Sequence, residues 1–155
     1  MRIEVDDLSR PEVHDFLREH LANMHELTPA ERVFALDLQH LRSPEITFWT
    51  VWEGDVLLGC GALKELSPTH GEIKSMRTPA KFRRRGAGRA VLEHILETAR
   101  ERGYEMLSLE TGSHPAFKAA QELYRSAGFE YSGPFGDYTA DPHSVFMSLR
   151  LAPAP

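Results

Sequence analysis

The sequence contains very little cysteine and no long apolar run. Cys60 is its one cysteine in 155 residues, which excludes an intrachain disulfide, and its neighbours Leu58 and Ala62 favour a buried, unreactive thiol. No apolar segment approaches the roughly 18 residues of a membrane-spanning helix. The acidic N-terminus is unlike a signal or transit peptide. These absences predict a soluble, cytoplasmic protein without a membrane partner or redox chemistry.

Positive charge is outnumbered by negative charge, with 18 Lys and Arg against 23 Asp and Glu. The formal net charge of -5 argues against a general nucleic-acid binder, which would present a basic face to the phosphate backbone. The eight histidines are dispersed, and no pair has metal-ligand spacing with a third ligand, so we expect no metal site. An apolar content of 41% suffices for one core. We therefore expect a single domain over residues 1–151 and a disordered tail over residues 152–155.

Hydrophobic periodicity and turn residues predict the order β-α-α-β-β-β-α-β-α-β-β. Ser9 and Glu12 have the spacing of a capping box before the first helix. The expected helices cover residues 10–24, 28–41, 89–102 and 115–127. The expected strands cover residues 2–5, 46–52, 56–66, 71–78, 106–110, 129–131 and 144–151. This order predicts an α/β (α+β) domain.

The most informative segment is the basic, glycine-containing turn at residues 83–89, between an expected strand and an expected helix. Glycine lets the backbone approach an anion, and the first amides of a helix are unpaired and carry partial positive charge. The turn therefore predicts a phosphorylated cofactor. A P-loop is excluded because Gly88 is followed by Arg89-Ala90, and a Rossmann fingerprint because the third glycine is missing.

Two motifs resemble signatures of the GNAT superfamily of N-acetyltransferases. Arg83-x-x-Gly86-x-Gly88 is similar to its pyrophosphate loop, and Tyr124-x-x-x-Gly128-Phe129 is similar to its second signature. The turn at residues 133–138 also resembles a bacterial branch of small uncharacterised members. The resemblance implies a GNAT fold, with a mixed, mostly antiparallel twisted sheet of about seven strands flanked by about four helices.

The same resemblance implies acetyl-CoA as the cofactor and assigns positions to it. The family's pantetheine arm pairs with the fourth strand, and its diphosphate binds loop amides. The implied contacts are Met76, Arg77 and Thr78 for the arm, and Arg83, Arg84, Arg85, Gly86, Ala87, Gly88 and Arg89 for the diphosphate. Many members carry an asparagine seven residues before the tyrosine, where this chain has Phe117, which puts a side-chain hydrogen bond there in doubt.

Acetyl transfer to an amine needs a neutral amine, a polarised thioester carbonyl and a proton for the departing thiolate. Tyr124 is the candidate general acid, and the backbone N–H of Met76, freed by a local bulge, is the implied carbonyl donor. Glu72 has the spacing of the catalytic glutamate in the histone-acetyltransferase branch, eleven residues before Arg83. Glu110, or a chain of water molecules, is the competing route for deprotonation.

The acceptor is expected between the first two helices and the loops near the last strands. Candidate contacts there are His25, Phe34, Trp49, Glu110, Phe135 and Asp137. Asp137 suits a polyamine or amino sugar, whereas the ring groups suit an arylalkylamine or a peptide N-terminus.

The leading prediction is an N-acetyltransferase acting on a small primary amine in a ternary complex. The alternatives are a non-catalytic acyl-CoA-binding or sensing protein, and an acetyltransferase of protein lysines or N-termini. A homodimer through the terminal strands is compatible with the sequence.

Overall fold

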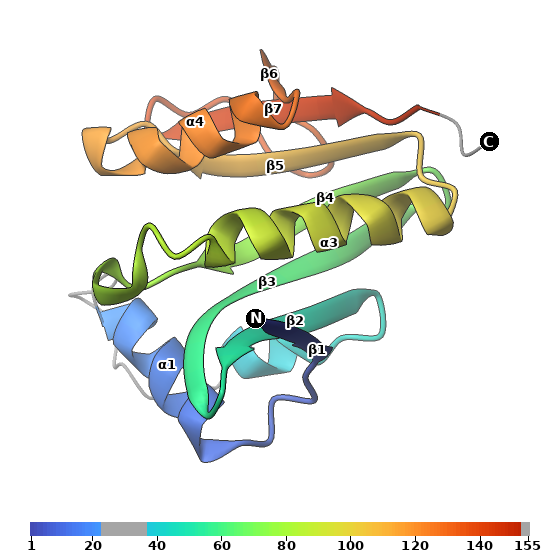
Figure 1. Ribbon diagram of the computed structural model, residues 1–155. Helices are drawn as coiled ribbons and strands as arrows, with labels where there is room; N and C mark the ends of the chain where they lie inside the picture. The colour runs from blue at the N-terminus through green and yellow to red at the C-terminus, as the bar shows by residue number, and fades with distance from the viewer. Residues whose placement is uncertain (23–36, 153–155) are drawn as a thin grey trace.

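The computed structural model describes residues 1–22 and 37–152. Within these ranges the strands form one sheet of seven, in the order β1-β2-β3-β4-β5-β7-β6 (Figure 1). The strands are β1 (Arg2–Val5), β2 (Ile46–Glu53), β3 (Val56–Ser67), β4 (His70–Arg77), β5 (Met106–Gly112), β6 (Glu130–Ser132) and β7 (Ser144–Arg150). Neighbours pair antiparallel, except that β4 and β5 are parallel. The predicted mixed, mostly antiparallel sheet is confirmed.

Helices cover both faces of this sheet. They are α1 (Pro11–Ala22), α3 (Ala87–Glu101) and α4 (Lys118–Ser126), with short 3-10 turns at Ala80–Phe82 and Pro115–Phe117. Residues 37–41 are also helical, and the rest of the second expected helix lies outside the described residues. Among the described helices, none is long and apolar enough to cross a membrane.

The core consists of two layers, one on each side of the sheet. On one side α3 and α4 bury Val91, Ile95 and Tyr124 against the strands. On the other side α1 buries Val13 and Leu17 against β2 and β3. Because successive strand residues point to opposite faces, β2 contributes large side chains to both layers. A fully buried apolar side chain of this size stabilises the fold by about 1.5–3 kcal/mol.

The entry into α1 differs from the predicted capping box. The Ser9 hydroxyl and amide both point back to Asp7 Oδ1, over 2.5 and 3.0 Å. The helix instead begins after Arg10, whose carbonyl accepts from the amides of Val13 and His14. Pro11 explains the shift, because proline lacks an N–H and favours the first helical position, which makes Arg10 the cap.

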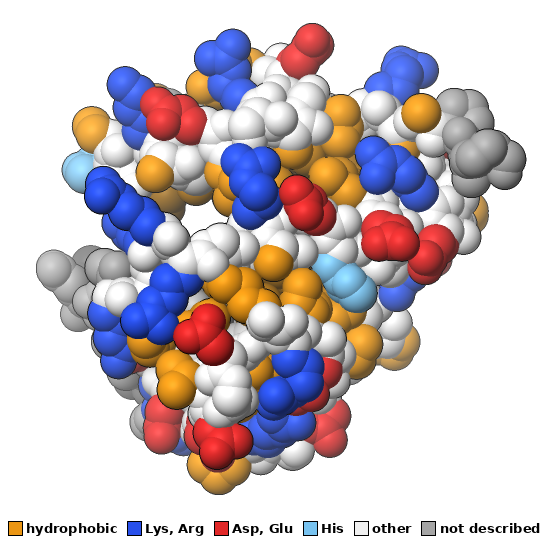
Figure 2. Space-filling model, in the orientation of Figure 1, with side chains coloured by type: hydrophobic (Ala, Val, Ile, Leu, Met, Phe, Trp, Pro, Cys, Tyr) orange, Lys and Arg blue, Asp and Glu red, His pale blue; other side chains and the backbone are white. Residues whose placement is uncertain are grey.

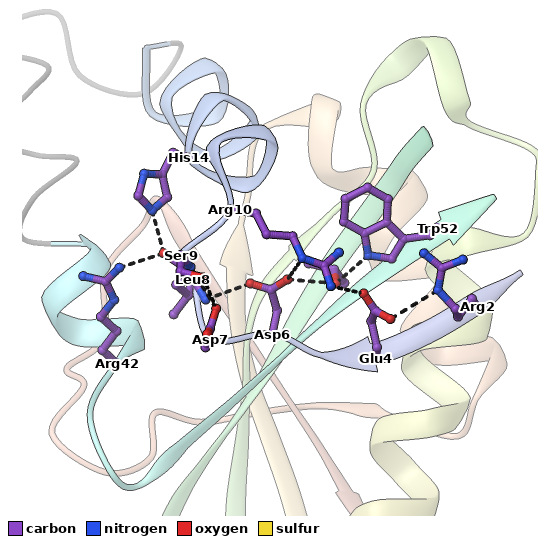
Figure 3. Close-up of polar contacts among 11 residues, drawn as sticks. Arg2, Glu4, Asp6, Asp7, Leu8, Ser9, Arg10, His14, Arg42 and Trp52 are labelled. Carbon is purple, nitrogen blue, oxygen red and sulfur yellow. Dashed lines mark hydrogen bonds and ion pairs between the residues drawn. The ribbon is translucent and has the colours of Figure 1, made fainter. Parts of the chain in front are cut away.

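Leu8 fixes the path of the chain between β1 and α1 (Figure 3). It is buried and has a left-handed φ of 65°, which is uncommon outside glycine. Its carbonyl accepts from His14 Nε2 and from Arg42 Nη2 at 2.7 Å, and its amide donates to Asp6 Oδ1 at 2.7 Å. These bonds hold the start of α1 next to Arg42, the residue that follows the helical turn at 37–41.

Candidate active site

The parallel strands β4 and β5 separate halfway along their length. They pair from His70 with Met106 to Ile73 with Leu109, after which β5 continues against β7 as far as Gly112. We call the unpaired edges, residues 74–77 of β4 and 110–112 of β5, the β4–β5 fork. An extended ligand can pair with such strand edges as an added strand does.

A bulge distorts β4 at this fork. Cys60 and Ala62 of β3 are two residues apart, but their partners Arg77 and Lys74 are three apart, so β4 contains one extra residue. Ser75 has a left-handed φ of 55°, and the Cys60 thiol donates to its carbonyl over 3.2 Å. Bulges of this kind leave one residue out of the ladder. Met76 therefore lies in the expected bulge, and its role as carbonyl donor stays a prediction.

The basic turn leads directly into α3. Arg84 and Gly86 have left-handed φ values of 68° and 84°, and Gly86 is the N-cap of the helix, with no side-chain cap. The first helical bond runs from the Ala90 amide to the Gly86 carbonyl, so the amides of residues 87–89 precede the ladder. The helix begins two residues earlier than predicted, and its first turn is therefore part of the candidate anion site.

Thr78 follows the last residue of β4, and its hydroxyl lies beside the first turn of α3. A Cβ on Gly59 would lie 2.7 Å from the Arg77 carbonyl oxygen and 3.2 Å from Thr78 Oγ1. A Cβ on Gly88 would lie 3.7 Å from the same hydroxyl and 3.4 Å from Leu123 Cδ2. These glycines let the strand end and the first turn of α3 pack closely together.

The arginines around the turn are exposed, and two of them have surface partners. Arg85 forms an ion pair with Glu53 at 3.5 Å, and Arg89 Nη2 donates to Ser126 Oγ at 3.2 Å. Arg83 and Arg84 are exposed as well. Lys and Arg side chains gather over the end of the molecule where α3 starts (Figure 2). A phosphate there would meet both backbone amides and positive charge.

Tyr124 of α4 is buried on the side of the sheet that carries α3. Its ring contacts Phe129 edge-on at 5.9 Å, and burial raises the pKa of its hydroxyl well above the ordinary range. The hydroxyl makes no hydrogen bond with any described residue. It is therefore a neutral donor available for a ligand. Phe117, by contrast, is exposed and rests on the backbone of Gly112, beside the fork.

The opposite face of the sheet carries a pocket of about 630 Å³. Its lining combines four carboxylates with two lysines and the loop between β6 and β7. The lining residues are Glu45, Lys64, Glu65, Leu66, Glu72, Lys74, Gly136, Asp137 and Tyr138. This size lies within the range of small-ligand sites.

Glu72 is 3% exposed and lies one residue before the last β4–β5 pair. Its Oε2 accepts from the Tyr138 hydroxyl at 2.6 Å and from Lys74 Nζ at 3.4 Å. Burial, together with the hydrogen bond to Glu72, raises the pKa of Tyr138 well above its ordinary value. The carboxylate is thus oriented through one oxygen.

Sequence reasoning missed the roles of Lys74 and Tyr138 in this arrangement. Alternation along β4 could have identified Lys74, since residues two apart share a face. Tyr138 had no such signal, because only the fold brings its loop onto β4.

Packed rings hold this loop on the sheet. Tyr138 contacts Phe135 at 5.0 Å and Phe146 at 5.6 Å, and Phe135 lies 6.0 Å from the His70 ring. Asp137 is exposed at the pocket rim. Of the predicted acceptor contacts, Asp137 lines the pocket, whereas Phe135 does not line it and packs against the rings of Tyr138 and His70.

The other predicted acceptor contacts lie elsewhere. Trp49 is wrong for this role, because it is buried on the α3 side of the sheet, edge-on to His94 at 5.5 Å. Glu110 is exposed, accepts from the Ser144 hydroxyl at 2.7 Å and does not line the pocket. His25 and Phe34 lie outside the described residues.

The sequence model of the acetyltransferase (GNAT) family matches residues 10–129. The chain belongs to this family. It is 56% identical to the uncharacterized N-acetyltransferase YsnE of Bacillus subtilis (strain 168), over 97% of this chain and 100% of that protein. It is 48% identical to the uncharacterized N-acetyltransferase YedL of Escherichia coli (strain K12), over 96% of this chain and 94% of that protein. The predicted GNAT acyltransferase of a bacterial, uncharacterised branch is thereby confirmed.

A third relative and the solved structures agree with this placement. The chain is 42% identical to the IAA acetyltransferase of Azospirillum brasilense, over 81% of this chain and 82% of that protein. Its fold is similar to an aminoglycoside 6'-N-acetyltransferase complexed with coenzyme A, with a TM-score of 0.77 and 18% identity over 100% of this chain and 99% of that one. The GNAT fold is thus found in the described structure as the motifs implied.

Proposed function

We propose that this GNAT protein transfers an acetyl group from acetyl-CoA to the primary amine of a small molecule, by direct attack in a ternary complex. One observation carries the proposal. Two features flank the β4–β5 fork. The candidate anion site at the start of α3 lies beyond the end of β4. Glu72, which lines a pocket of small-molecule size, lies immediately before the point where β4 and β5 separate. The coenzyme A bound in the aminoglycoside acetyltransferase of similar fold supports the choice of donor.

The residues present fit a coenzyme A thioester. Amides of residues 84–89 would hold the diphosphate at the start of α3, where Gly86 provides the left-handed turn and Gly88 has no side chain to block the approach. Met76, Arg77 and Thr78 would pair with the pantetheine arm along the free edge of β4. Tyr124 is the neutral hydroxyl we assign to the sulfur.

The chemistry follows from three groups of this chain. Glu72 accepts a proton from the acceptor ammonium, and the freed amine attacks the thioester carbonyl. The Met76 amide donates to the carbonyl oxygen as negative charge develops on it. As the C–N bond forms and the C–S bond breaks, Tyr124 donates its proton to the departing sulfur. The nitrogen releases its second proton to water as the amide forms, Tyr124 takes up a proton from water, and Glu72 releases its proton to solvent.

The first test measures coenzyme A release with a thiol-reactive dye, using acetyl-CoA and a panel of amines, amino acids, polyamines, amino sugars and short peptides. We expect Glu72→Gln to lower kcat/KM at least about 100-fold, the usual contribution of a general base. Glu110→Gln is the matched variant for the competing carboxylate. A larger loss in Glu110→Gln, or full turnover with an unchanged pH profile in Glu72→Gln, removes Glu72 from the mechanism.

The same panel separates the two other classes of function. Tight acetyl-CoA binding with no release on any amine would favour a sensing protein. Release on peptides but not on small amines would favour a protein acceptor. The volume of the pocket, about 630 Å³, is that of a small-ligand site and favours the small molecule.

A further inference from the structure

Lys64 is a pocket lysine whose charge has no hydrogen-bond or ion-pair partner among the described residues. It lies on β3, lines the pocket and is half-buried. It forms no hydrogen bond and no ion pair with any residue of the described ranges. A long cationic side chain held in a pocket wall, without a counterion, is available to an anionic ligand.

Its position relative to the proposed base is fixed by the sheet. Lys64 and Glu72 are register partners across the antiparallel pair of β3 and β4. Directly opposite residues have Cβ atoms about 4.5–5.5 Å apart and point to the same face. A ligand group bound by Lys64 is therefore within a few ångströms of a group at Glu72.

The other charged side chains of the pocket either have a hydrogen-bond partner or are exposed to solvent. Lys74 is already bound to Glu72 Oε2 and to the Tyr138 hydroxyl, both at 3.4 Å. Glu65 accepts from the Tyr104 hydroxyl at 2.8 Å, and Glu65, Glu45 and Asp137 are exposed, so solvent screens them. Of the two lysines in the described lining, Lys64 is thus the one that makes no hydrogen bond or ion pair with a described residue.

We propose that Lys64 binds a carboxylate of the acceptor, which makes the acceptor an amino acid or a similar amine carrying an acid group close to its nitrogen. The inference rests on the proposed function. A carboxylate suits the site better than a phosphate because one ammonium balances one negative charge. The amine of such a molecule is directed to Glu72 and its acid group to Lys64.

The test compares each amino acid with its own carboxamide as acceptor, in the wild type and in Lys64→Gln. The carboxamide keeps the amine in place and removes the negative charge. Amine basicity also differs between the two acceptors, but this difference cancels when the acid-to-amide ratio of kcat/KM is compared between the two enzymes. Lys64→Arg restores the charge. Arg100→Gln, at the exposed C-terminal end of α3, removes one positive charge outside the pocket.

We expect the wild type to prefer the acids and Lys64→Gln to lose this preference by about tenfold or more, the usual effect of removing one charged hydrogen bond. Lys64→Arg and Arg100→Gln should retain the preference. Thermal unfolding and acetyl-CoA binding by calorimetry, unchanged in Lys64→Gln, show that the variant is folded and loads its donor.

Two results overturn the inference in distinguishable ways. Release on amides or polyamines, with the same acid-to-amide ratio in wild type and Lys64→Gln, rejects the carboxylate site and leaves the proposed function intact. Acetyl-CoA binding without release on any acceptor rejects the proposed function and the inference together.

Discussion

The Tyr138 hydroxyl donates to Glu72 Oε2 over 2.6 Å, across 66 positions of sequence. One partner lies on a strand at the centre of the sheet, and the other on the loop between β6 and β7. The loop is held by the rings of Phe135 and Phe146. The orientation of the Glu72 carboxylate therefore depends on a loop that is far from β4 in the sequence.

The first prediction concerns Tyr138→Phe. The Tyr138 hydroxyl makes the shortest hydrogen bond to the Glu72 carboxylate, so removing it leaves the proposed base without the donor that orients it. We expect kcat/KM to fall about tenfold. The measurement is the steady-state rate of coenzyme A release.

Phe135→Leu controls for this experiment by loosening the loop without removing the hydroxyl. It should lower kcat/KM less than Tyr138→Phe does. An equal or larger loss in Phe135→Leu would show that Tyr138 only packs.

The second prediction concerns Tyr124→Phe. The hydroxyl has no partner among the described residues, and burial raises its pKa, so it is a neutral proton donor. We expect kcat to fall about 100-fold or more, with unchanged acetyl-CoA affinity and unfolding temperature. Steady-state kinetics and calorimetry check both parts. Tyr131→Phe, which removes a surface hydroxyl bonded to Gln121, is the matched control. An equal, small effect in both variants would contradict the role of Tyr124.

The third prediction concerns the glycines of the basic turn. Gly86 has a φ of 84°, so Gly86→Ala should destabilise the fold by about 1–2 kcal/mol and weaken acetyl-CoA binding. Gly54→Ala is the control, because Gly54 also has a left-handed φ, 59°, with no atom within 4 Å of a Cβ, but lies in the β2–β3 hairpin. It should cost similar stability without changing acetyl-CoA affinity.

Gly88→Ala completes this series. Its Cβ would make ordinary contacts within the protein, so stability should change little while acetyl-CoA affinity falls. Urea unfolding measures the loss of stability in the three variants, and calorimetry measures their affinity for acetyl-CoA. Together they separate backbone strain from loss of ligand contact. Equal acetyl-CoA affinity in all three would place the phosphate elsewhere.

The fourth prediction concerns Cys60. Burial raises the pKa of its thiol to about 12, and the predicted burial of this thiol is confirmed. The unfolded thiol ionises near its ordinary value of 9.0, so the unfolded state loses a proton first as pH rises. The thiol's contribution to stability is present below pH about 9 and is lost between pH about 9 and about 12.

Cys60→Ala should therefore be less stable than the wild type by about 1 kcal/mol at neutral pH. The difference should shrink by about 1 kcal/mol by pH about 10, as measured by urea unfolding at both pH values. A difference that is constant with pH would contradict the burial of the thiol. Native protein should also leave a thiol-reactive dye unreacted, so that the dye reports only released coenzyme A.

Local patterns in the sequence are sufficient for the order of the described elements and for the basic turn. Period-two and period-3.6 alternation indicate which side chains face a core, and a glycine at position 86 permits a left-handed turn. The sequence predicts the start of α3 two residues late because glycine lowers helix propensity, although the first turn tolerates it. These features depend on neighbours along the chain.

The acceptor side could not be predicted in the same way. Trp49 and Phe48 are adjacent and similar in size, and only the pairing of β2 with β1 and β3 decides which of them faces α3. The contact between Tyr138 and Glu72 depends on how a loop folds back over the sheet. Side chains brought together by tertiary structure leave no periodic signal in the sequence.

The parallel pairing of β4 with β5 has a mechanical consequence. Four register pairs join strands β1 to β4 to the remaining three, whereas β5 and β7 share seven. The backbone pairing between the two parts of the sheet is therefore short and confined to residues 70–73 of β4. A thioester arm lying along residues 76–78 would extend this pairing beyond the last β4–β5 pair. Backbone amides on both sides of the fork should then exchange their hydrogens with solvent more slowly.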